Sequence, residues 1–265
     1  MKTNFKMLLL ILFAGLSNND CRDDAMNIDY TKEVPDKSVT SNIIFEDNFD
    51  KDGIPDKNKW RFYYRLKDDG WGNWFSESYD QAYVKDGMLI LKAEKVGDIY
   101  KTGGVTTQDL FKFTYGKLEI RAKFKTFEGG SPSLWILNTT GQPVNGEIDL
   151  AEQYNDDDFV YQTLWSNYTL NLKQNDPVNK TKVEYNENEF NTYAINWTSE
   201  KIVFSVNGIN TMTYPNMHLA NEKAMGQWPF NKPFYILITF PVSLTGVIDS
   251  ELPGYMMIDW VKVTQ

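Results

Sequence analysis

Apolar and polar residues alternate along many short runs of the chain from about residue 43 onward. Clear examples are residues 87–93, 118–125 and 233–240. Alternation with a period of two is typical of β-strands that bury one face. Gly, Asn, Asp and Pro bound these runs, and no stretch has a convincing helical pattern. The pattern predicts an all-β fold, built as a two-sheet β-sandwich or jelly roll.

Turn residues fix how some of these runs connect. Residues 192–197 and 201–206 are predicted to form a hairpin around Thr198-Ser199-Glu200. Asn207-Gly208 then marks the next tight turn, because this dipeptide readily adopts the left-handed backbone that short hairpins require.

The first 42 residues differ from the rest of the chain. Lys2 and Lys6 precede an apolar run over residues 7–16, which is typical of a signal peptide and too short to span a bilayer. We therefore expect a signal peptide over 1–20, a polar linker over 21–42 and one folded domain over 43–265. All-β sandwiches commonly reach this length as single domains.

Cys21 is the only cysteine and directly follows the predicted signal peptide. A lone cysteine excludes an internal disulfide framework and a cysteine-based metal cluster. Its position suggests lipidation, although Asn18-Asn19-Asp20 departs from the small residues expected before a lipidated cysteine. We expect an exported protein, either a lipoprotein of the cell surface or outer membrane, or a periplasmic or secreted protein.

Three carboxylates occur within one short stretch, Gly146-Glu147-Ile148-Asp149-Leu150-Ala151-Glu152-Gln153. In a strand, Glu147 and Asp149 share one face, because side chains alternate. Glu152 would fall on the opposite face unless one extra residue intervenes. A β-bulge at Leu150-Ala151 corrects this parity, and bulges often re-aim side chains next to active sites. The stretch predicts a row of Glu, Asp and Glu on one face.

Such a row suits retaining glycoside hydrolysis, which uses two carboxyl groups roughly 5–5.5 Å apart as nucleophile and proton donor. Asp149, between the two glutamates, would hydrogen-bond one of them and hold their protonation states apart. The alternative is a solvated strand face whose acids point to water.

The motif Glu147-x-Asp149-x-x-Glu152 resembles the bulged signature of glycoside hydrolase family 16, which includes laminarinases, lichenases, agarases, carrageenases and endo-β-galactosidases. Residues 115–123, 131–137 and 257–263 also resemble strands of this family, in the expected order. The likeness covers about residues 43–265. It implies a concanavalin-like jelly roll in which Glu147 is the nucleophile, Asp149 the assisting acid and Glu152 the general acid/base.

Four tryptophans are candidates for binding sugar. The resemblance implies that Trp135 lies under the sugar at the cleavage point, while Trp71 and Trp74 belong to a glycine-containing loop. Trp165 stands where many glucan-cleaving relatives carry histidine. Residues 240–246 also depart from the Gly-Gly-Trp-type sequence of laminarinase-like members. The alternative for each tryptophan is a place in the aromatic core.

The formal net charge is −9 with a pI near 4.8, which disfavours nucleic acid or an anionic membrane surface as partner. It also mildly disfavours strongly sulfated polyanions as substrate. The resemblance implies a possible structural calcium at Asp259, with Gly87 contributing a carbonyl. No catalytic cofactor is expected. His218, the sole histidine, is expected to be an ordinary surface or packed residue.

The combined prediction is a monomeric, retaining, endo-acting β-glycosidase. The departures at Trp165 and around Leu244 favour an endo-β-1,4-galactosidase acting on galactose-containing glycans. An endo-β-1,3(4)-glucanase is the alternative, and a non-catalytic glycan-binding protein is the alternative from another class. Three intact acids argue against the last, since a binding protein does not need all of them.

Overall fold

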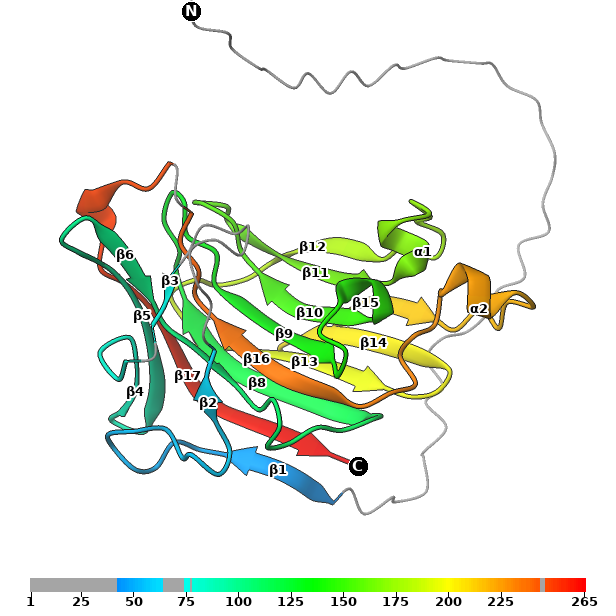
Figure 1. Cartoon of the computed structure of the whole chain (residues 1–265), viewed down its shortest axis with the longest axis horizontal. Helices are drawn as coiled ribbons and strands as arrows, with labels where there is room; N and C mark the ends of the chain where they lie inside the picture. The colour runs from blue at the N-terminus through cyan, green and yellow to red at the C-terminus, as the bar shows by residue number, and fades with distance from the viewer. Residues whose placement is uncertain (1–41, 64–73, 77, 244–245) are drawn as a thin grey trace, which may run out of the picture. The chain divides into compact units, whose positions relative to one another are not determined.

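Two mostly antiparallel β-sheets make up nearly all of the described chain in the computed structural model (Figure 1). The structure describes residues 42–63, 74–76, 78–243 and 246–265. The two sheets form two layers, and the predicted all-β, two-sheet sandwich is confirmed. Residues 41–265 form one compact unit.

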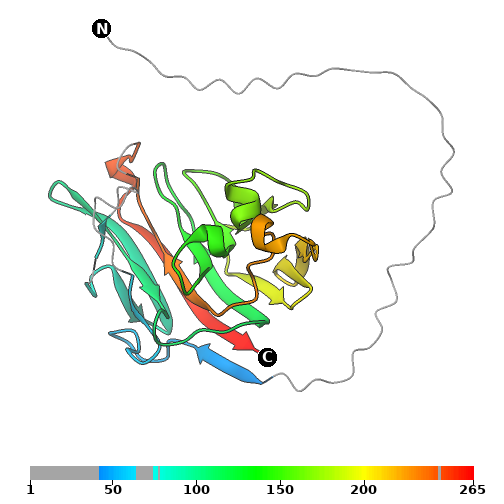
Figure 2. The same cartoon turned by 45° about the vertical axis from the view of Figure 1, so that its right-hand side comes forward.

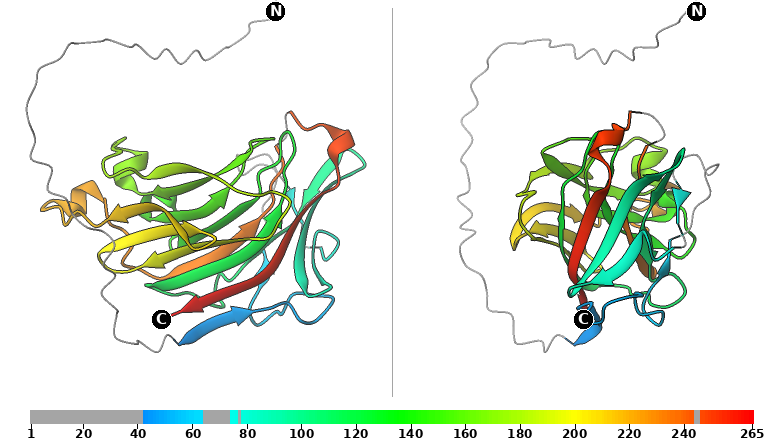
Figure 3. Two further views of the ribbon diagram at one scale, coloured as in Figure 1. Left: turned by 180° about the vertical axis from the view of Figure 1, so that it is seen from behind. Right: turned by 90° about the vertical axis from the view of Figure 1, so that its left-hand side faces the viewer.

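The first sheet has ten strands, with the path β15-β14-β13-β8-β17-β5-β6-β3 and with β1 beside β17 and β4 beside β5. Figure 3 shows β1 running along β17, where Asn42 and Gln265 exchange backbone hydrogen bonds of 2.8 and 2.9 Å. The strands are β1 (Ile43–Asp47), β3 (Trp74–Phe75), β4 (Ala82–Lys85), β5 (Met88–Val96), β6 (Ile99–Thr102), β8 (Gly116–Phe124), β13 (Asn191–Trp197), β14 (Lys201–Val206), β15 (Ile209–Pro215) and β17 (Gly254–Thr264).

The second sheet has seven strands in the order β12-β11-β10-β9-β16-β7-β2. It carries the acidic stretch on β10, near its middle. The strands are β2 (Arg61–Phe62), β7 (Gly104–Thr106), β9 (Ser133–Asn138), β10 (Glu147–Glu152), β11 (Phe159–Trp165), β12 (Lys180–Glu184) and β16 (Phe234–Thr239).

Helices in the described residues are short. They are the 3-10 turns η1 (Pro143–Asn145) and η2 (Asp249–Glu251) and the α-helical turns α1 (Asn167–Leu170) and α2 (Glu222–Met225). The two α-helical turns lie side by side (Figure 2), and Asn167 Nδ2 donates to the carbonyl of Met225 at 3.0 Å. Within the described residues, no helix is long and apolar enough to cross a membrane.

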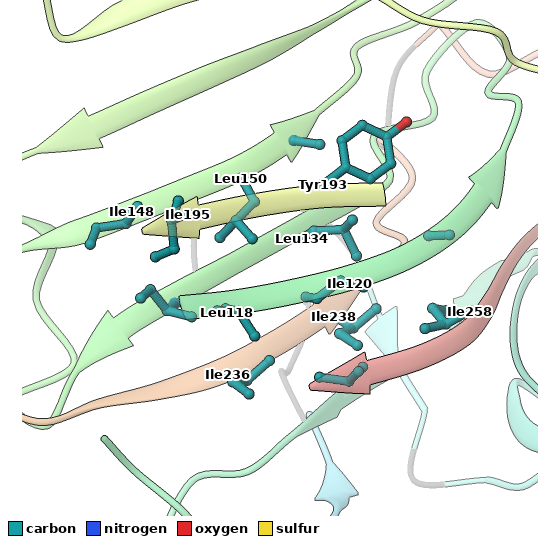
Figure 4. Packing of buried hydrophobic residues seen from close by; sticks show 14 of the residues in the cluster. Leu118, Ile120, Leu134, Ile148, Leu150, Tyr193, Ile195, Ile236, Ile238 and Ile258 are labelled. Atoms are coloured by element: carbon teal, nitrogen blue, oxygen red, sulfur yellow. The ribbon is translucent and has the colours of Figure 1, made fainter. Parts of the chain in front are cut away.

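The main hydrophobic core lies between the sheets. Figure 4 shows Ile148 and Leu150 of β10 among aliphatic side chains of the facing strands, including Leu118 and Ile195. All four side chains are fully buried. Burying one such side chain stabilises the fold by about 1.5–3 kcal/mol, so the apolar half of β10 anchors the strand to the opposite sheet.

The predicted hairpin is confirmed, since β13 and β14 pair antiparallel from Tyr193↔Val206 to Trp197↔Ile202. The next turn is also where the sequence predicted it. Asn207 and Gly208 have φ of 52° and 80°, which is the left-handed backbone that a two-residue hairpin turn needs.

The predicted signal peptide, most of the linker and Cys21 lie outside the described residues. Export and lipidation therefore stay predictions, and so does the expected monomer.

Candidate active site

The acidic stretch forms β10, and its pairing shows the predicted bulge. On the β9 side, Asp149 pairs with Trp135 while Ala151 pairs with Leu134, so Leu150 is an extra residue. On the β11 side, one residue separates the partners of Asp149 and Glu152, whereas β10 has two residues there. The bulge at Leu150-Ala151 is confirmed.

Two local features shape β10, one at its start and one at the bulge. Gly146, just before β10, has φ of 112°, and a Cβ there would lie 2.7 Å from Phe234 Cζ. Only glycine fits this backbone without strain. At the bulge itself, Gln162 Nε2 donates to the carbonyl of Leu150 at 3.1 Å. This bond satisfies a buried acceptor that the irregular ladder would otherwise leave unpaired.

The bulge divides the side chains of β10 between two faces. Ile148, Leu150 and Ala151 belong to the core between the sheets. The three acids therefore lie on the opposite face of the seven-stranded sheet, which we call the open face. Asp149 is only 1% exposed, and its two glutamate neighbours are half-buried.

Asp149 is the centre of the acidic row. Trp165, across on β11, donates its Nε1–H to Asp149 Oδ2 at 2.9 Å. Burial raises the pKa of Asp149 well above its usual range, and the charges of Glu152 and Glu147 raise it further. The raised pKa favours the protonated form of Asp149, which donates a hydrogen bond to Glu152.

Opposing influences act on the pKa of Glu152. Burial raises its pKa, while hydrogen bonds from Tyr154 and Asp149 and the positive charge of Lys180 oppose the rise. Burial also raises the pKa of the Tyr154 hydroxyl strongly, and Glu152 adds to this effect, so Tyr154 remains a donor. A carboxyl group with a raised pKa can hold a proton near neutral pH and give it to a leaving group.

Removing the Tyr154 hydroxyl should change the pH dependence of the reaction. The hydroxyl stabilises the ionised form of Glu152, so Tyr154→Phe is expected to raise the pKa of Glu152 further. The basic limb of the kcat/KM profile should then move to higher pH. Tyr100→Phe is the matched control. Tyr100 also donates its hydroxyl proton to a carboxylate, that of Asp249, at 2.8 Å, but it lies on β6 of the other sheet. An unmoved basic limb in Tyr154→Phe would contradict this assignment.

Aromatic and apolar side chains continue the open face next to the acids. Trp135 pairs in register with Asp149 and donates its Nε1–H to Thr239 Oγ1 at 3.0 Å. It packs on a small cluster formed by Leu137, Tyr235 and Leu237. Tyr63 meets the Trp135 ring edge-on with the ring centroids 6.1 Å apart. A half-buried tryptophan held in this way can serve as a platform for a sugar ring.

Other predicted site residues lie elsewhere or outside the described part. Trp71 is not described, and neither are Leu244 and Thr245. Trp74 belongs to β3, which pairs with β6 at the edge of the ten-stranded sheet. His218 is exposed, and its Nε2 lies 2.8 Å from Glu200 Oε2, which agrees with the expected surface position.

The residues named for calcium do not form a set of oxygen ligands that fits this ion. Gly87 lies in the β4–β5 turn, and Asp259 lies on β17. The carboxylate of Asp259 forms a salt bridge with Arg121, whose guanidinium supplies the positive charge that a cation would bring. Calcium takes six to eight oxygen ligands, and among the described residues no group of three or more His, Cys, Asp or Glu is arranged so that it could hold a metal ion. The calcium site stays a prediction that these contacts do not favour.

Some residues of the site were missed by the sequence analysis. Tyr154 follows Glu152 by two positions, so strand alternation past the bulge could have found it. Gln162 and Lys180 come from neighbouring strands, and no local pattern connects them to the acids. Their roles depend on the strand register.

Residues 71–262 match the sequence profile described as "Glycosyl hydrolases family 16". This match spans more than half of the chain. The chain belongs to glycosyl hydrolase family 16. It is therefore a glycoside hydrolase, and the predicted family and enzyme class are confirmed.

Two curated relatives and one solved structure show the range of this family. A beta-glucanase of Rhodothermus marinus is 30% identical over 249 residues, which cover 86% of each chain. A keratan-sulfate endo-1,4-beta-galactosidase of Sphingobacterium multivorum is 27% identical and covers 99% of this chain and 67% of its own length. The crystal structure of SCLam, a non-specific endo-beta-1,3(4)-glucanase, superposes with a TM-score of 0.75 at 26% identity, covering 85% of this chain and 91% of its own.

Proposed function

We propose that this family 16 enzyme is a retaining endo-β-1,4-galactosidase that cuts internal bonds of galactose-containing glycans. One observation carries the retaining mechanism: Glu147 and Glu152 share the open face of one strand, with buried Asp149 between them. A pair of carboxyl groups at short range is what a double displacement requires.

In the first step, Glu152 donates its proton to the glycosidic oxygen while the carboxylate of Glu147 attacks the anomeric carbon. The bond from the anomeric carbon to the leaving oxygen breaks, and a covalent glycosyl–Glu147 ester forms. Burial raises the pKa of Glu152, which favours the protonated form that this step needs.

In the second step, ionised Glu152 takes a proton from water, and the resulting nucleophile attacks the anomeric carbon. The ester bond to Glu147 breaks, the sugar is released with its original configuration, and Glu152 has regained its proton. Asp149 donates a hydrogen bond to Glu152 and so stabilises its ionised form at this stage.

Trp165 is evidence for a galactose-containing substrate. It stands where many glucan-cleaving members carry histidine, and its indole N–H is already committed to Asp149. Together with Trp135 it offers aromatic surface on both sides of the acids. The axial 4-hydroxyl of galactose leaves an uninterrupted C–H face on the opposite side of the ring, which stacks well on indole. A galactosidase among the similar proteins is consistent with this choice.

An endo-β-1,3(4)-glucanase is the second candidate. The beta-glucanase relative and the SCLam structure favour it. On this alternative Trp165 takes over the role of the usual histidine without changing the sugar that is bound.

Product sizing distinguishes the two candidates. The protein is incubated separately with laminarin, mixed-linkage β-glucan and poly-N-acetyllactosamine, and oligosaccharides are separated by size. Products from poly-N-acetyllactosamine alone are expected. Products from either glucan, with the lactosamine chain intact, would overturn the galactosidase proposal in favour of the glucanase. The Glu147→Gln variant, run in parallel, shows that any cleavage comes from this site.

A further inference from the structure

Two lysines extend the acidic row toward the β12 edge of the sheet. Lys180 pairs with Thr163, which pairs with Asp149, and Lys182 pairs with Tyr161, which pairs with Glu152. Lys180 and Lys182 therefore lie on the open face, two strands from the acids. Two strand spacings are about 10 Å.

The ammonium groups of both lysines lie over aromatic rings. Lys180 Nζ lies 3.8 Å from the centroid of the Tyr161 ring, and Lys182 Nζ lies 4.0 Å from that of Phe159. The two rings meet edge-on with their centroids 5.1 Å apart. The ring centroids of Tyr154 and Tyr161 are 5.5 Å apart, so a row of adjacent aromatic rings extends from beside Glu152 to the two lysines. Cation–π contacts restrict where these flexible side chains point.

Both lysines are exposed, and within the described residues neither forms a salt bridge. The acid nearest along β12 is Glu184, which pairs with Phe159 at the far end of the strand. Glu152 is close enough for the charge of Lys180 to oppose the rise of its pKa that burial causes. The positive charge is therefore available to a ligand bound beside the catalytic row.

This local charge is opposite in sign to that of the whole chain, which is −9. Charges separated by more than a Debye length, about 8 Å at physiological ionic strength, are largely screened. A substituent held next to the two ammonium groups responds to them rather than to acids elsewhere. The expectation from net charge, which disfavours sulfated substrates, does not apply at this edge.

We infer that Lys180 and Lys182, seated on Tyr161 and Phe159, form a subsite for an anionic substituent on a sugar of the glycan. This inference rests on the proposed function and specifies its substrate class. A sulfate ester and a carboxylate present the same chemistry to an ammonium group, which is a compact charge with three donors.

The test compares three glycans with one backbone: neutral poly-N-acetyllactosamine, its sulfated form and its sialylated form. The double variant Lys180→Gln/Lys182→Gln removes both charges and keeps the side chains polar. Lys201→Gln/Lys223→Gln is the control, because it changes net charge equally at exposed sites on β14 and α2. For each protein, kcat/KM is measured on all three glycans at low and high salt.

The wild type is expected to prefer at least one anionic glycan over the neutral one. The double variant should lose about tenfold or more of this preference, which is the ratio of kcat/KM on that glycan to kcat/KM on the neutral one, since hydrogen bonds to charged groups are strong. Losing the Lys180 charge also affects the pKa of Glu152, but this effect is common to all three glycans and cancels in the ratio. High salt should weaken the preference of the wild type. Which anionic glycan responds identifies sulfate or carboxylate as the substituent.

Equal activity of the wild type on all three glycans would overturn the inference while leaving the proposed function intact. Equal losses in the double variant and the control would do the same. Failure to cleave any of the three glycans would instead overturn the proposed function, and the inference with it.

Discussion

Replacing Glu147 with glutamine is expected to lower turnover by on the order of 10⁴-fold or more, with no loss of folding stability. The amide has nearly the same shape as the carboxylate but cannot attack the anomeric carbon. Because Glu147 is half-buried at the start of β10 and points away from the core, its charge is not needed for packing. Turnover is measured on the glycan that the wild type cleaves, and stability by thermal unfolding.

Azide distinguishes a missing nucleophile from a general disturbance of the site. In Glu147→Ala, azide can occupy the vacated space, attack the anomeric carbon directly and give a glycosyl azide of inverted configuration. Glu184→Gln is the matched control, since it removes a carboxylate from the same open face on β12. Wild-type turnover in Glu147→Gln would rule out the assignment of the nucleophile.

Replacing Glu152 with glutamine is expected to cost about 10²–10⁴-fold in kcat/KM on a natural glycan, where the leaving sugar must be protonated. The loss should depend on the leaving group. Dinitrophenolate leaves a dinitrophenyl glycoside without needing a proton, so kcat/KM of Glu152→Gln on this substrate should differ from the wild-type value by less than about tenfold.

Without Glu152, the second step also lacks its base, so the glycosyl–enzyme should accumulate. A burst of dinitrophenolate comparable to the enzyme concentration should precede slow turnover, and azide should speed that turnover with retained configuration. Equal losses on the glycan and the aryl glycoside would exclude Glu152 as the proton donor. The wild-type enzyme, which needs no azide, provides the reference.

Strand periodicity explains why much of the site could be predicted. The period of two assigns Ile148 and Leu150 to the core, and it leaves Glu152 on the wrong face unless a bulge intervenes. This parity mismatch can be read from the six residues 147–152 alone, and the strand pairing shows the expected bulge. The hairpin turn at Asn207-Gly208 was predictable for a similar reason, since its backbone needs are local.

The register in which two strands pair is not encoded in the alternation pattern of either strand. The sequence predicts Trp165 as a sugar-binding residue but not the hydrogen bond from its indole N–H to Asp149, which forms because β11 pairs with β10 in one particular register. The salt bridge of Asp259 with Arg121 across the β8–β17 pair was likewise not predicted, because it too depends on register. Neither partner follows from periodicity.

The sequence by itself determined the two-sheet fold, the bulge and the face that carries Glu147, Asp149 and Glu152, because each follows from alternation within a strand. Only the tertiary structure decided what surrounds that face. Burial of Asp149, the hydrogen bond from Trp165 to Asp149 and the position of Lys180 over Tyr161 all depend on how neighbouring strands pair in the folded sheet. Protonation and electrostatics depend on distance in space, which a linear pattern does not contain.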